Sequence, residues 1–257
     1  MTDAPSRTRL LQFAIGTAGL ALAWQLASLF FPDYLFPSLA QIGSRFVEIT
    51  TSWPELVEVL TTAVRILAGL AGAFILGVIL ALALNKSRAL EAYLTPILTL
   101  LQGVPALSWV VIAIIWFHGT EFRILFIMVV TTLPAFTFQI LDAVRSMSKD
   151  LFEMTIAFRP TRWKLFRVLV VPTVVPGILT AWKVNLGNAS RVVVVAELVG
   201  ATGGVGYQLL RQQQLFDMAG AIAWTLQLVI FVLIFQGVIA AVEQWALGWR
   251  PRSERAI

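Results

Sequence analysis

Six stretches of this chain are apolar over about 20 residues or more, which restricts the possible folds more than any other feature. An α-helix crosses the roughly 30 Å hydrocarbon core of a bilayer in about 20 residues. Hydrophobic residues make up 58% of the 257-residue chain and charged residues 13%, so a water-soluble domain is not expected. Repeated strand-like alternation does not occur, which favours helices over a barrel. The sequence therefore predicts an all-α membrane protein with six transmembrane helices, at about residues 10–31, 61–84, 94–117, 122–144, 170–199 and 219–246.

Most basic residues fall in alternate connections between these stretches, where cytoplasmic loops carry an excess of Lys and Arg. An even number of spans then places both termini in the cytoplasm. This distribution explains the net charge of +5 without a nucleic-acid partner. The first stretch begins like a signal peptide, but it continues through Phe31 and is predicted to be a retained helix. The basic positions are Arg7, Arg9, Lys86, Arg88, Arg145, Lys149, Arg159, Arg162, Lys164, Arg167, Arg250, Arg252 and Arg255.

The chain has few of the residues that catalysis or metal binding requires. It contains no cysteine, and His118 is its sole histidine, so neither a thiolate site nor a multi-histidine site is available. A phosphate-binding GxxxxGK[ST] loop is absent. We therefore expect no catalytic residue, no metal and no cofactor in this chain.

The segment 150–169 is charged and helix-forming, and it lies between two of the apolar stretches. Leu151, Met154 and Phe158 have helical spacing, Pro160 disfavours continuation of that helix, and Thr161 can cap a second helix through Leu169. The prediction is an elbow of two short amphipathic helices. Such an elbow can lie on lipid headgroups or insert into a groove on a soluble partner, and the pattern alone favours neither.

Polar residues interrupt the fifth and third apolar stretches. A charge at the bilayer centre costs at least about 2.5–3.5 kcal/mol, so these side chains should face protein or water. They are predicted to line a substrate pathway. A structural alternative is that Lys183 extends to the membrane surface while Arg191 pairs with Glu197 or with a neighbouring helix, without contact to solute. The candidate pathway residues are Gln102, Lys183, Asn188, Arg191 and Glu197.

Several ordered motifs resemble a known family. The order of Glu153-Met154-Thr155, Arg159-Pro160-Thr161 and Val171-Pro172 resembles the EAA loop of permease subunits in binding-protein-dependent ABC importers. Glycine usually stands where this chain has Arg159. Further segments resemble the nitrate, sulfonate, taurine and bicarbonate group, and the similarity covers about residues 60–250. These segments are 62–69, 193–200, 204–207 and 215–217.

The resemblance implies a type I ABC importer permease fold, with residues 1–257 forming one transmembrane domain and 150–169 acting as a cytoplasmic coupling elbow. It also implies a bacterial plasma (inner) membrane location, two ATPase subunits that bind ATP and Mg, a second permease copy and a solute-binding protein. A small anion such as a sulfonate, nitrate or bicarbonate is the expected solute. The alternative is a secondary transporter with coupling residues in its own helices. The implied ATPase-coupling residues are Glu153, Met154, Thr155, Arg159, Pro160 and Thr161.

Overall fold

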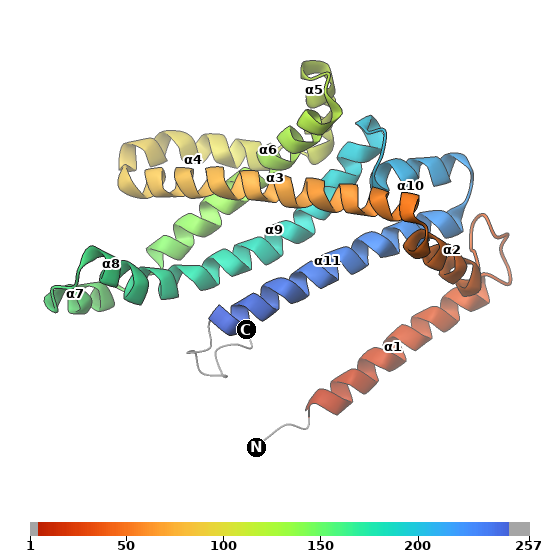
Figure 1. Ribbon diagram of the computed structural model, residues 1–257, viewed down its shortest axis with the longest axis horizontal. Helices are drawn as coiled ribbons and strands as arrows, with labels where there is room; N and C mark the ends of the chain where they lie inside the picture. Colours follow the sequence, from red (N-terminus) through yellow and green to blue (C-terminus); the bar gives the residue numbers. More distant parts are fainter. Residues whose placement is uncertain (1–4, 247–257) are drawn as a thin grey trace.

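The computed structural model describes residues 5–246, and all regular structure in that range is helical (Figure 1). The N-terminal half contains α1 (Pro5–Ala27), α2 (Leu39–Thr51), α3 (Trp53–Lys86), α4 (Arg88–Gly103), α5 (Ala106–Trp116) and α6 (Thr120–Arg145). The C-terminal half contains α7 (Lys149–Ala157), α8 (Arg162–Leu165), a π-helical turn η1 (Phe166–Val170), α9 (Val171–Gly200), α10 (Val205–Gln214) and α11 (Met218–Ala246).

The all-helical membrane architecture is confirmed, but the count of six spans is not. Within the described residues, four helical runs are long and apolar enough to cross a membrane: Trp53–Lys86, Thr120–Arg145, Arg162–Gly200 and Met218–Ala246. The predicted span 94–117 is instead the pair α4 and α5, bent by 97°, which gives a fifth span if the pair crosses as one. Proline cannot donate the helical hydrogen bond and disfavours helical backbone before it, so Pro105 accounts for the break.

The first predicted span is also shorter than expected. Helix α1 ends at Ala27, whereas the span was predicted to continue to residue 31. Turns replace helix over residues 28–31 of the predicted span, just before Pro32. Helix α1 lies apart from the other long helices in Figure 1. Its hydrogen bonds reach the segment that leads into α2, where Trp24 Nε1 donates to the Pro37 carbonyl at 3.0 Å.

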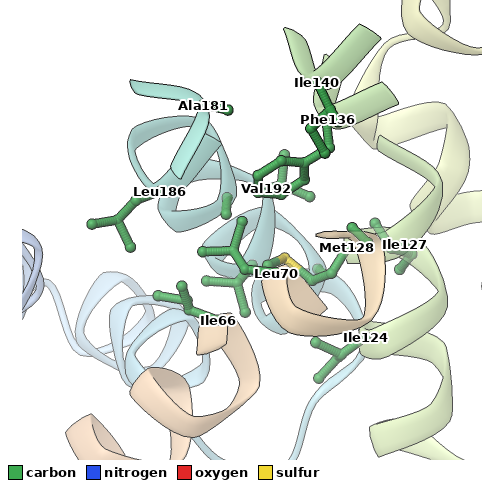
Figure 2. Packing of buried hydrophobic residues seen from close by; sticks show 14 of the residues in the cluster. Ile66, Leu70, Ile124, Ile127, Met128, Phe136, Ile140, Ala181, Leu186 and Val192 are labelled. Carbon is green, nitrogen blue, oxygen red and sulfur yellow. The ribbon is translucent and has the colours of Figure 1, made fainter. Parts of the chain in front are cut away.

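Helices α3, α6 and α9 pack together to form the main core, as Figure 2 shows. Ile66, Leu70, Met128, Phe136 and Leu186 are fully or almost fully buried there. In a membrane, helix association depends on close packing because lipid tails are as apolar as the helices. Glycines permit this approach: a Cβ on Gly69 would lie 2.6 Å from Met128 Cβ, one on Gly77 2.9 Å from Phe136 Cβ, and one on Gly177 2.5 Å from Ala143 Cβ.

The connections gather at two ends of this core. At one end, Arg145 at the end of α6 makes two hydrogen bonds of 2.7 Å to Glu91 near the start of α4, close to where the chain enters α7. At the other end, Arg45 of α2 pairs at 3.0 Å with Asp217, just before α11. A hydrogen bond to Glu48 and the nearby charge of Asp217 raise the pKa of Arg45 above its ordinary value. Connections therefore lie at both ends of the core, which agrees with the prediction that successive loops alternate between the two sides of the membrane.

The fifth span begins earlier than predicted. Helix α8, the π-turn η1 and α9 form one continuous helical run, Arg162–Gly200, instead of a separate short helix followed by a span at 170–199. Val171 N–H donates to the Phe166 carbonyl five residues back. Pro172 cannot donate, and its ring would collide with the carbonyl four residues earlier in a regular helix. A π-turn next to Pro172 widens the helix at this position.

Candidate functional site

The elbow projects from one end of the bundle (Figure 1). Ser148 caps α7, accepting from Leu151 N–H at 3.5 Å, and Thr161 caps α8, accepting from Lys164 N–H at 3.3 Å. Several large apolar side chains on the elbow are exposed, including Phe158 at 81% and Trp163 at 69%. Most of the candidate coupling residues are exposed with them. Glu153, Met154 and Thr155 lie on α7, and Arg159, Pro160 and Thr161 form the turn to α8.

Arg159 makes the turn in an uncommon backbone conformation. Its φ of 47° lies in the left-handed region, and its N–H donates to the Ile156 carbonyl at 2.8 Å. It is therefore the residue just past the C-cap of α7, where glycine is the usual choice because it has no Cβ to collide with the backbone. The left-handed backbone at position 159 thus explains why the family usually has glycine there.

Helices α9 and α11 border a groove that holds two of the five candidate pathway residues. One part of about 510 Å³ is lined by Arg191 and Ser190, and a second part of about 520 Å³ is lined by Lys183. Both parts are lined by Leu233 and Gln236 of α11, so they lie next to each other. The remaining lining residues are Val184, Gly187, Val194, Leu209, Thr225, Leu228, Val229, Val232, Gly237 and Ala240.

The two cations in this groove differ in their surroundings. Lys183 forms an ion pair with Glu243 of α11, so its charge is matched inside the protein. The exposed Arg191 has no hydrogen bond or ion pair within the described part of the chain. The groove is otherwise lined largely by aliphatic side chains. Arg191 is therefore the side chain in the groove that is free to attract an anionic group.

Glu197 lies in the core and not along the groove. It is fully buried, and its carboxylate accepts from Arg65 Nη1 at 2.7 Å, from Thr62 Oγ1 at 2.9 Å and from Gly206 N–H at 2.8 Å. The alternative in which Arg191 pairs with Glu197 is wrong, because Arg65 of α3 occupies that position. Glu197 therefore does not belong with the candidate residues that line the groove.

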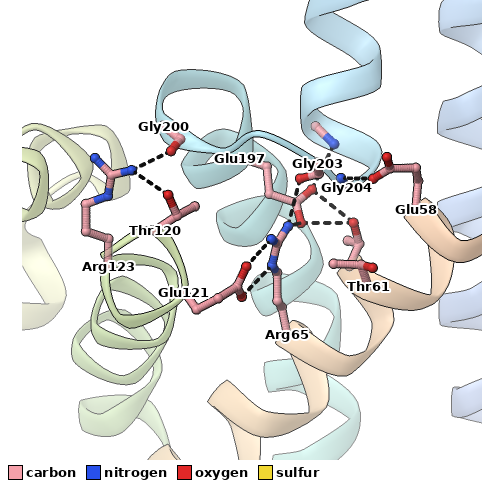
Figure 3. A network of polar contacts seen from close by, with 12 residues as sticks. Glu58, Thr61, Arg65, Thr120, Glu121, Arg123, Glu197, Gly200, Gly203 and Gly204 are labelled. Atoms are coloured by element: carbon pink, nitrogen blue, oxygen red, sulfur yellow. Dashed lines mark hydrogen bonds and ion pairs between the residues drawn. The ribbon is translucent and has the colours of Figure 1, made fainter. Parts of the chain in front are cut away.

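Arg65 also bridges to a third helix. Its Nε donates to Glu121 of α6 at 2.9 Å, so Arg65, Glu121 and Glu197 form a polar clamp joining α3, α6 and α9 (Figure 3). Buried charges persist only when they are paired and hydrogen-bonded, and Glu197 meets both conditions. The clamp holds these helices together at the end opposite the elbow.

The clamp fixes the glycine-rich loop between α9 and α10. Arg65 Nη1 donates to the Gly203 carbonyl at 2.8 Å, and Glu58 accepts from Gly204 N–H. Gly204 has a φ of 103°, and a Cβ there would lie 2.4 Å from a Glu197 oxygen. This position therefore requires glycine for both its backbone angle and its space. The loop is a tightly held connection between the two helices.

The other two candidate pathway residues lie elsewhere. Gln102 is exposed at the end of α4, just before the bend, and Asn188 is exposed on α9; neither lines the groove. Glu121 and Glu243 were missed as partners of Arg65 and Lys183. Glu243 could have been found, since an acidic residue inside the apolar stretch 219–246 needs a partner for the same reason as Lys183.

The Lys183–Glu243 pair is expected to join α9 to α11. Lys183→Glu should lower the melting temperature of the purified protein by several degrees, because two carboxylates would then meet in a site only about one-third exposed. Glu243→Lys should have a similar effect through two ammonium groups. The double exchange Lys183→Glu, Glu243→Lys should recover most of the loss. A double variant no more stable than either single variant would show that the pair does not connect these helices.

Apolar spans, charged side chains along a helix groove and a projecting cationic elbow together define a membrane transport protein. Residues 73–247 match the family of binding-protein-dependent transport system inner membrane components. The chain belongs to this family, so the resemblance seen in its motifs is confirmed.

Relatives and a solved structure agree with this family. The chain is 26% identical to the formylaminopyrimidine transport permease protein ThiX of Halalkalibacterium halodurans, over 91% of this chain and 93% of the relative. It is 25% identical to the taurine transport system permease protein TauC of Escherichia coli, over 94% and 91%. A chain of the inward-facing MetNI methionine ABC transporter superposes with a TM-score of 0.60 at 18% identity, covering 76% of this chain and 99% of that one. The structural similarity establishes the fold alone.

Proposed function

We propose that this chain is the permease subunit of an ATP-driven importer in a bacterial plasma membrane, with both termini in the cytoplasm. The observation that carries the proposal is the exposed, capped elbow at one end of a membrane bundle in a chain of this family. Two separate ATPase subunits, which bind ATP and Mg, would contact the elbow. A solute-binding protein would dock at the opposite end, near α2 and α10, and a second copy of the permease would complete the pathway.

The α9–α11 groove is the proposed surface along which the solute moves. Its apolar walls and the unpaired Arg191 suit a small anion such as a sulfonate, nitrate or bicarbonate. Lys183 contributes less than the sequence suggested, because Glu243 matches its charge. The relatives are named for solutes of different chemistry, formylaminopyrimidine and taurine, so Arg191 is the basis for proposing an anion. A secondary transporter is not favoured, because the family is that of binding-protein-dependent systems.

Reconstituted transport tests this function. Solute uptake into proteoliposomes should require the separate ATPase subunit and ATP, and omission of either should abolish it. Glu153→Lys should leave ATP hydrolysis running while uptake falls at least about tenfold, because the substitution reverses a charge on α7 at the proposed contact. Asp142→Lys, an exposed charge reversal on α6 outside the elbow, serves as the matched control and should transport normally. Uptake driven by an ion gradient without the ATPase would contradict the proposal.

A further inference from the structure

Arg159 keeps a backbone conformation that is unfavourable for its side chain. Only two non-glycine residues among those described have a positive φ, Arg159 at 47° and Phe216 at 54°. The left-handed region is unfavourable for an ordinary L-residue because its Cβ lies too close to the backbone, whereas glycine has no Cβ. Asparagine tolerates this region better than most residues, yet the chain has arginine here. Strain of this kind often accompanies a functional contact.

No contact inside the chain compensates for this strain. Arg159 is exposed and has no hydrogen bond or ion pair from its side chain among residues 5–246. The segment from Lys149 to Arg167 contains five basic and two acidic residues, a net charge of +3. Its neighbours in the turn, Phe158 and Pro160, offer no carboxylate. Arg159 is therefore an exposed cation on a segment of net positive charge, with no partner among the described residues.

We propose that Arg159 forms an ion pair with a carboxylate on the ATPase subunit that receives the elbow. This inference rests on the proposed function and adds a contact that a glycine at this position cannot make. Arginine binds a carboxylate through two parallel hydrogen bonds of fixed geometry. The left-handed turn, with Pro160 after it, sets the direction in which the Arg159 side chain leaves the backbone.

A lipid phosphate is the competing partner and is less well supported. Attraction of basic residues to anionic headgroups is diffuse, and each residue contributes by being near the surface. Arg162, Lys164 and Arg167 already supply such charge without any backbone strain. A single strained position indicates a directional contact, which favours a protein carboxylate.

Four substitutions separate charge from backbone strain. Arg159→Lys keeps both the charge and the strain, and Arg159→Ala keeps the strain but removes the charge. Arg159→Gly and Arg159→Asn remove the charge and relieve the strain to different degrees. Each variant is placed in nanodiscs of neutral lipid and, separately, in nanodiscs that contain anionic lipid. The melting temperature of the permease and its affinity for the purified ATPase subunit are then measured at low and high salt.

The affinity for the ATPase should depend on the charge of residue 159, and the melting temperature of the permease should depend on the backbone strain at that residue. Alanine, glycine and asparagine should each weaken binding by roughly tenfold and reduce its salt dependence, whereas lysine should retain most of it. Glycine and asparagine should raise the melting temperature of the permease alone. Equal affinity of Arg159→Ala and the unchanged protein would overturn the inference, as would a charge effect seen only with anionic lipid. If Glu153→Lys still uncouples transport in that case, the proposed function stands without the Arg159 contact.

Discussion

Replacing Glu197 with alanine is expected to cost about 3–5 kcal/mol of stability, because the substitution removes the fully buried partner of the Arg65 guanidinium and leaves it with the largely exposed Glu121. Thr62 and the Gly206 N–H would lose an acceptor at the same time. The expected result is a melting temperature lowered by ten degrees or more, on the order of several degrees per kcal/mol. Thermal unfolding of the detergent-solubilised protein measures it.

Glu121→Ala is the matched control for this prediction. Glu121 also pairs with Arg65, but its side chain is 65% exposed, so water can replace it and the loss should be small. The double variant Arg65→Met, Glu197→Leu should be more stable than Glu197→Ala alone, since it leaves no uncompensated buried charge. Equal melting temperatures for Glu197→Ala and Glu121→Ala would show that the clamp does not hold the three helices.

Gly177→Ala is expected to destabilise the packing of α9 on α6 by about 1–3 kcal/mol, through overpacking. The added Cβ would lie 2.5 Å from the Cβ of Ala143 and 3.5 Å from its Cα, too close for the helices to remain in place. Thermal unfolding and the yield of monodisperse protein should both fall.

The reciprocal change Ala143→Gly provides the decisive control. Combined with Gly177→Ala, it returns the contact to one methyl group between the helices and should restore most of the stability. Gly237→Ala on α11, where nothing lies within 4 Å of an added Cβ, should be neutral or slightly stabilising because alanine favours helix. Failure of Ala143→Gly to rescue would place the cause outside this contact.

Local patterns in the sequence predicted the elements that depend on local physics. Apolar length identified the long helices, and Pro160 with Thr161 predicted the break and the cap between α7 and α8. The sequence could not predict the partner of Glu197, because Arg65 lies 132 residues away and meets it only after three helices pack. Arg191, on the same helix as Glu197, was considered as a partner, but sharing a helix did not bring the two side chains together.

The number of spans was also predicted incorrectly because the sequence pattern carries no information on how helices are oriented. Hydropathy measures how apolar a stretch is but not its direction, so residues 94–117 were predicted as one span although α4 and α5 meet at 97°. Hydropathy also separated the elbow from the fifth span. The residues before Val170 include charged ones and lower the hydropathy, although the helix continues through them by way of a π-turn. In the groove, residue type alone identified Lys183 and Arg191 as candidates. Their surroundings differ because Glu243, on another helix, pairs with Lys183.

The continuous helical run Arg162–Gly200 has a mechanical consequence. At about 1.5 Å per residue, its 39 residues form a rod on the order of 55–60 Å long, with the elbow at one end and the Arg65 clamp at the other. The regular hydrogen-bond ladder of this run is interrupted at the π-turn beside Pro172, which is a position where a helix can bend. A force applied to the elbow would therefore bend the run first at this turn, before it moves the part of α9 that carries Lys183 and Arg191.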